Sequence, residues 1–173
     1  QIATIDVAYD LAFLVMDLDV RGFRRFANRA LSRYICRQGG VEVLAALPLM
    51  LALRAGVRAK VTAMTLAGPE DAAESARLAR HVERFTEAAE RFVAPAAPPC
   101  LIAVGGLSGS GKTTLATALA PDLGRAPGAL LLRSDILRKR LAGVNPEQRL
   151  PDTAYTPESN QRVYQTIMRE AAA

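Results

Sequence analysis

A glycine-rich segment of eight residues constrains this chain more than any other feature of its sequence. Residues 106–113 read GLSGSGKT and match the pattern G-x-x-x-x-G-K-[ST] in full. A short apolar run, 100–104, precedes the segment, and a helical pattern, 115–119, follows it. Glycines permit backbone angles closed to other residues, so consecutive N–H groups can turn inward as an anion-binding nest. A helix that opens near Gly111 adds unsatisfied N–H groups and the positive end of its dipole.

This segment predicts how a nucleotide would be held. Lys112 supplies a point charge for the β- and γ-phosphates, and the hydroxyl of Thr113 can ligate Mg²⁺. We therefore expect ATP and Mg²⁺ as cofactors. The alternative is a glycine-rich turn that binds nothing, and the strand and helix expected on either side argue against it. The expected nucleotide-binding residues are Gly106, Leu107, Ser108, Gly109, Ser110, Gly111, Lys112, Thr113 and Thr114.

A second candidate for chemistry follows another apolar run, 129–133. Asp135 falls just past the end of that run, where ligands of open α/β sheets bind. A carboxylate there can take the proton of an attacking hydroxyl or hold a Mg²⁺-bound water. Arg138 lies on the same side of the helix that begins here and could clamp an anionic group of the substrate. The alternative is that Ser134 or Asp135 is only a helix N-cap and Arg138 a surface residue.

The periodicity divides the chain into a helical part, residues 1–93, a stiff Pro/Ala linker, 94–99, and a part with mixed patterns, 100–173. Two apolar runs in the last part are expected as buried parallel strands. The fold class is therefore predicted as α/β: an all-helical segment followed by the first part of a P-loop NTPase, a three-layer domain with a parallel sheet, truncated. Helices are expected at about residues 7–18, 23–35, 41–66, 69–92, 115–119, 136–141 and from 157, with Gly39–Gly40 and Gly68–Pro69 as breaks and Thr156 as an N-cap.

Composition narrows the classes of function. Half of the 173 residues are hydrophobic, the net charge is only +5, and aromatic residues make up 5%. The basic residues form no arm and the aromatic content is too low for a base-stacking channel, which argues against a nucleic-acid partner. The longest uncharged apolar run, 43–53, is shorter than the roughly 20 residues that span a bilayer. Cys36 and Cys100 are predicted as buried small hydrophobic residues in a reducing compartment, so we expect a cytoplasmic protein. His81 has no Cys or second His near it in the sequence, which argues against a metal site.

Residues 101–170, with GLSGSGKTT, LLLRSDILRKRL and YTPES, resemble the gluconate-kinase-like P-loop kinases, AAA-family ATP-binding proteins. That group is similar to zeta toxin, chloramphenicol phosphotransferase and the phosphotransferase domain of polynucleotide kinase. In those enzymes an Asp activates the acceptor hydroxyl and a nearby Arg holds the substrate. The resemblance implies these catalytic roles for Asp135 and Arg138, beside Lys112.

Residues 2–67, with IDVAYDLAFLVMDLD and LALRAGVRAK, resemble the C-terminal helical end of aminoglycoside-phosphotransferase-like proteins. The resemblance implies that this half is inert by itself and that Asp6 and Asp10 are structural, with Asp10 capping or bracing a helix. P-loop kinases of the group have about five strands and this chain offers two, leaving a gap beside Val104. We therefore expect an internal fragment whose partners include the missing N- and C-terminal portions of the same polypeptide.

The sequence thus supports one main hypothesis and two alternatives. The main hypothesis is an ATP-dependent kinase that transfers the γ-phosphoryl group to a hydroxyl of a small molecule. The first alternative is a regulatory ATP-binding module without phosphoryl transfer. The second is a polynucleotide 5′-hydroxyl kinase, which the composition does not favour.

Overall fold

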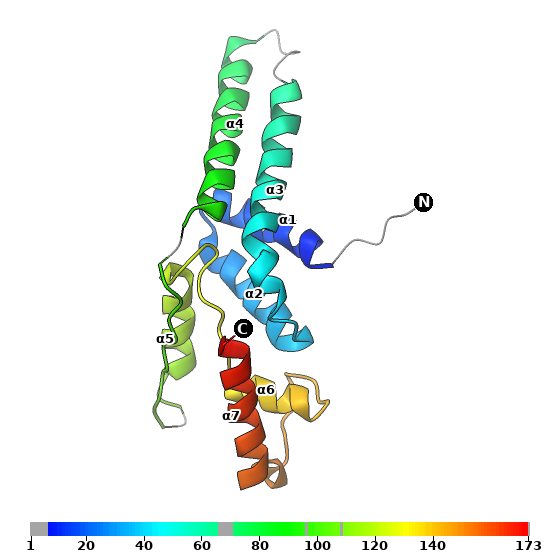
Figure 1. Ribbon diagram of the computed structural model, residues 1–173, viewed down its shortest axis with the longest axis vertical. Helices are drawn as coiled ribbons and strands as arrows, with labels where there is room; N and C mark the ends of the chain where they lie inside the picture. Colours follow the sequence, from blue (N-terminus) through cyan, green and yellow to red (C-terminus); the bar gives the residue numbers. More distant parts are fainter. Residues whose placement is uncertain (1–6, 66–70, 96, 108, 173) are drawn as a thin grey trace, which may run out of the picture.

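The computed structural model describes residues 7–65, 71–95, 97–107 and 109–172, and every regular element within these ranges is helical. Helices α3 and α4 lie side by side as a long antiparallel pair, with α1 and α2 near one end of it (Figure 1). The bounds are α1 Val7–Val20, α2 Arg24–Gln38, α3 Val43–Thr65, α4 Ala72–Val93, α5 Lys112–Leu119, α6 Ser134–Leu141 and α7 Pro157–Ala172, with 3-10 turns η1 Ala120–Asp122 and η2 Asp152–Ala154.

The hydrophobic core lies among α1 to α4. Their buried side chains recur three or four residues apart, which places each set on one face of its helix. The spacing confirms that this half is a helical assembly. Although α3 is the longest helix, no helix among the described residues is long and apolar enough to cross a membrane. The core residues are Ala12, Val15, Met16, Ala27, Leu31, Ile35, Val41, Leu47, Leu51, Ala55, Ala59, Phe85, Ala88 and Phe92.

Helix ends follow from the sequence at several positions. The amide of Ser159 donates to Thr156 Oγ1 at 3.2 Å, which confirms Thr156 as the cap of α7. Gly39, with a φ of 78°, ends α2 as expected. Asp71 caps α4 by accepting from the amide of Ala73 at 2.9 Å. The break expected at Gly68–Pro69 lies outside the described residues.

A buried carboxylate ties three helices of this half together. Asp19, in α1, has a side chain that is 2% exposed, and its Oδ1 accepts from Nε of Arg24, in α2, at 2.8 Å. Its Oδ2 accepts from Nη2 of Arg91, in α4. Both arginine side chains are partly exposed to solvent. Their positive charges compensate the negative charge of the buried Asp19 carboxylate.

Asp19→Asn is expected to lower the free energy of unfolding by about 2 kcal/mol. A buried pair that loses one partner costs about 3–5 kcal/mol, and the partial exposure of the two arginines reduces that cost. Asp10→Asn is the matched control, because Asp10 is 75% exposed and braces α1 to α3 through Arg54 at 2.7 Å. It should cost less than about 1 kcal/mol. Urea denaturation of both variants measures the difference, and equal costs would contradict the role of Asp19.

The prediction of an α/β fold with a parallel sheet is wrong for this structure. The described residues contain no strand, and no ladder of main-chain hydrogen bonds joins runs 100–104 and 129–133. A strand needs the main-chain hydrogen bonds of a neighbouring strand, and neither run has such a partner among the described residues. The first run is exposed, with Leu101 at 63%, and the expectation that Cys100 is buried is also wrong.

The second run instead packs against α2. Asn28 Nδ2 donates to the carbonyl oxygen of Ala129 at 2.9 Å, and the amide of Leu131 donates to Ser32 Oγ at 3.3 Å. Cys36 Sγ donates to the carbonyl oxygen of Leu131 at 3.2 Å. Buried main-chain groups need partners, and here side chains of a helix supply what a neighbouring strand would supply in a sheet.

Candidate functional site

The glycine-rich loop has the backbone that its sequence predicts. Gly106, Gly109 and Gly111 have φ values of 147°, 79° and 80°, which side-chain-bearing residues rarely adopt. A Cβ on Gly106 would lie 2.8 Å from Oγ of Ser110, so a side chain at this position would also displace the Ser110 hydroxyl. The amide of Ser110 donates to the carbonyl oxygen of Leu107 at 3.2 Å and closes the turn. The loop is thus a tight turn built on glycines.

The loop leads directly into a helix, as an anion-binding loop requires. Gly111 is the N-cap of α5 and offers no side chain, so the first amides of the helix have no side-chain cap. Lys112 is the first helical residue, and its Nζ donates back to the carbonyl oxygen of Leu107 across the turn. The ammonium group therefore already lies over the loop. Free amides, a helix dipole and one cation together favour a polyanionic ligand.

The residues that would hold Mg²⁺ beside a nucleotide fit that task in chemistry. Thr113 follows Lys112 in the first turn of α5 and is exposed, as is Thr114. A hydroxyl at this position is a hard oxygen ligand, the type that Mg²⁺ prefers, and the remaining ligands would come from phosphates and water. The described residues contain no cluster of His, Cys, Asp or Glu that could hold a metal by itself. Ser108, predicted as part of the loop, lies outside the described residues.

Asp135 lies in the first turn of α6 and is partly open to solvent. Its side chain is 45% exposed, and its Oδ2 lies 3.1 Å from Nζ of Lys139, one helical turn later. Lys139 is 12% exposed and also donates to the carbonyl oxygen of Pro146 at 2.9 Å, so its ammonium group is held beside the carboxylate. The cap of α6 is Arg133, without a side-chain hydrogen bond, so the alternative that Ser134 or Asp135 is the N-cap is wrong.

Arg138 is buried and engaged within the protein. It is 7% exposed, and its guanidinium donates to Oγ of Ser159 at 2.8 Å and to Oδ1 of Asn160 at 2.7 Å. The guanidinium also lies 4.8 Å from the ring centroid of Tyr155. These partners belong to the start of α7 and the loop before it. Arg138 therefore joins α6 to α7, and its role as an anion clamp stays a prediction.

The structure brings the predicted residues into two groups. Lys112 and Thr113 lie on the loop and α5, whereas Asp135 and Arg138 lie on α6. Helix α5 continues directly into η1, whereas α6 packs against α7 and α2. No hydrogen bond, ion pair or ring contact among the described residues joins the loop to Asp135.

Sequence reasoning missed the polar residues that position Asp135. Lys139 follows Asp135 by four residues, a spacing that already favours an ion pair on a helix. Asn28, Ser32 and Cys36 were missed as well. They recur every four residues beside the apolar face of α2, and such polar positions on a helix face indicate a polar partner.

Comparisons with known proteins bear on both halves of the chain. An uncharacterized protein of Mycobacterium bovis and one from each of two strains of Mycobacterium tuberculosis are 30% identical to it over 177 residues. The matched region is 99% of this chain and 33% of each relative. The chain therefore spans about a third of the length of the curated relatives it matches. No solved structure matches the chain.

The family comparison concerns the second half. A protein-family model described as an AAA domain matches residues 101–173. This range contains the glycine-rich loop, Lys112 and Asp135. Residues 101–173 are thus similar to an AAA domain, and they carry the complete G-x-x-x-x-G-K-T loop of P-loop, nucleotide-binding proteins.

Proposed function

We propose that the chain is part of an ATP-dependent kinase that transfers the γ-phosphoryl group to a hydroxyl of a small molecule. The observation that carries the proposal is the complete G-x-x-x-x-G-K-T loop, with three left-handed glycines, opening a helix at Lys112. The AAA-domain match over residues 101–173 supports it. The relatives are about three times longer, so we assign the activity to the whole protein, with the rest of the polypeptide as a partner of this chain.

Each residue has one task in this proposal. The loop amides and Lys112 bind the β- and γ-phosphates and stabilise the charge that develops on them during transfer. Thr113 ligates Mg²⁺, which offsets phosphate charge when it is bound. Asp135 accepts the proton of the acceptor hydroxyl while the oxygen of that hydroxyl forms a bond to the γ-phosphorus. The bond between the γ-phosphorus and the β,γ-bridging oxygen breaks, and ADP leaves. Because Lys112 Nζ donates to Leu107 in this structure, nucleotide binding requires it to turn toward the phosphates.

The resemblance of residues 2–67 to aminoglycoside-phosphotransferase-like proteins belongs to the same proposal. It implies that the helical half is the end of a second kinase-like lobe. The family match begins at residue 101, so this part depends on the sequence motifs alone.

Mg-ATP is expected to stabilise the full-length wild-type protein, and Lys112→Ala should remove about half of that effect or more. Ligand at 100 times its Kd stabilises the native state by about 2.7 kcal/mol, and the loss of one charge-assisted contact should weaken binding at least about tenfold. Thermal unfolding with and without Mg-ATP or Mg-GTP measures the shift. Lys60→Ala, an exposed lysine on α3, is the control and should behave as wild type. The absence of any nucleotide-dependent shift in the wild type would contradict the proposal.

A second candidate is an ATP-binding module that regulates a partner without transferring phosphate. It is favoured by one observation, that no contact among the described residues joins the loop to Asp135. This function predicts Lys112-dependent ATP binding with no labelled product when γ-labelled ATP is incubated with a broad set of hydroxyl compounds. A labelled hydroxyl compound would contradict this second candidate and support the kinase.

A further inference from the structure

Helix α2 holds the chain on both sides of Asp135. On the N-terminal side, Asn28, Ser32 and Cys36 contact the main chain of Ala129 and Leu131. Leu131 is only four residues before Asp135, so little chain lies between the anchored amide and the carboxylate.

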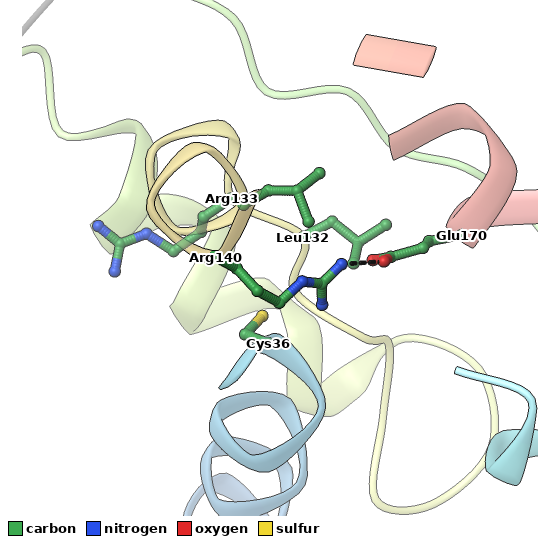
Figure 2. A pocket seen from close by; sticks show the side chains of 6 residues that line it. Cys36, Leu132, Arg133, Arg140 and Glu170 are labelled. Atoms are coloured by element: carbon green, nitrogen blue, oxygen red, sulfur yellow. Dashed lines mark hydrogen bonds and ion pairs between the residues drawn. The ribbon is translucent and has the colours of Figure 1, made fainter. Parts of the chain in front are cut away.

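On the C-terminal side, the anchor is Arg140. Its Nη1 donates to the carbonyl oxygen of Ile35, near the end of α2, at 3.3 Å, and its Nη2 pairs with Glu170 of α7. Figure 2 shows this meeting point, with Cys36 rising from α2 beneath the Arg140 side chain and Glu170 reaching toward it from α7. Arg140 is 19% exposed and Glu170 is 8% exposed, so the ion pair is largely shielded from water.

The contacts on the two sides act on one short segment. Residues 131–140 run from the amide held by Ser32 to the guanidinium held by Ile35, and Asp135 lies between them. The burial of Asn28, at 4% exposed, and Ser32, at 7%, makes these contacts costly to lose, because water cannot easily replace them. Such a segment has little freedom to shift along or away from α2.

We propose that α2 is a positioning element for Asp135, so that the helical half of the chain sets the geometry of the transfer reaction in the other half. Asn28 and Ser32 are positioning residues, since they act on the carboxylate through residues 129–134. The catalytic consequence rests on the proposed kinase function. That α2 holds residues 129–140 depends only on the hydrogen bonds between them, and not on the proposed function. The helical half is therefore a working part of the site and not an inert remnant.

Two variants of the full-length protein test this inference. Asn28→Asp keeps the size of the side chain but turns the donor to Ala129 into an acceptor, and Ser32→Ala removes the acceptor of the Leu131 amide. Hydrogen exchange at residues 131–137 should become about tenfold faster in both. The kcat for release of the γ-phosphoryl group of ATP, to water or to an acceptor, should fall about tenfold while the KM for ATP stays within about twofold. If Asn28 and Ser32 only stabilised the fold, the two variants would lower Tm but would not lower kcat at an unchanged KM for ATP.

Matched controls make the outcome decisive. Gln38→Glu makes the same amide-to-acid change at an exposed position of α2 and should leave exchange and kcat unchanged. Ser32→Thr keeps the hydroxyl and should retain most of the wild-type kcat. Unchanged exchange at residues 131–137 in Ser32→Ala and Asn28→Asp would overturn the holding of the segment by α2. Faster exchange with unchanged kcat would overturn the positioning role, whereas a wild type that binds no nucleotide would overturn the proposed function itself.

Discussion

Asp135→Asn is expected to reduce the rate of phosphoryl transfer by the full-length protein about 10²- to 10⁴-fold. This is the usual contribution of a positioned general base, and an amide of the same shape cannot accept the proton. The side chain of Asp135 is 45% exposed and paired with Lys139, so its carboxylate is open to an acceptor hydroxyl. Transfer from γ-labelled ATP under saturating substrate measures kcat directly.

Nucleotide binding separates this effect from a loss of folding. Asp135 makes no contact with the loop in the described residues, so Asp135→Asn should keep the Mg-ATP thermal shift of the wild type. Asp122→Asn, an exposed carboxylate in η1, is the matched control and should keep full activity. Transfer at the wild-type rate by Asp135→Asn, with ATP still bound, would show that another group takes the proton.

Gly128→Ala is expected to lower the free energy of unfolding more than any other alanine substitution proposed for this protein. Gly128 has a φ of 116°, and a Cβ on it would lie 2.3 Å from the carbonyl oxygen of Ala120 and 2.6 Å from Cα of Pro121. The left-handed backbone costs about 1–2 kcal/mol, and displacing packed main-chain atoms costs about 1–3 kcal/mol more. We expect a total of about 3 kcal/mol or more, and a change in the path of residues 129–133.

Gly124→Ala is the matched control for this prediction. Gly124 also has a positive φ, of 68°, but a Cβ there would meet no atom within 4 Å. It should therefore cost only the backbone term, about 1–2 kcal/mol. Urea denaturation gives both free energies of unfolding, and in a chain of this size each kcal/mol corresponds to about 2–4 °C in Tm. If the two variants lower the free energy of unfolding equally, a Cβ at position 128 does not clash with η1 as predicted.

The helices and the phosphate loop could be predicted from local sequence. Helical periodicity, the stop at Gly39 and the cap at Thr156 are properties of neighbouring residues, and the structure confirms them. The loop at 106–113 is also local, since glycine spacing and a following helix are sufficient to define its backbone.

The position of Asp135 relative to the rest of the chain could not be predicted in the same way. A half-buried apolar run such as 129–132 fits a strand or a packed irregular segment equally well, and its partner decides between them. Here the partner is α2, about 100 residues earlier, and its side chains satisfy main-chain groups that a strand would otherwise pair.

Arg138 shows the same division between local and distant information. From sequence it is a cation one turn after a carboxylate. Only the packing of α6 on α7 buries it against Ser159 and Asn160 and joins the two helices. The sequence by itself determined which segments are helical and where the tight glycine turn before α5 lies, because these depend on backbone preferences within a few residues. The tertiary structure alone decided that residues 129–133 pack on α2, because the free energy of burying polar main-chain groups depends on partners far away in the chain.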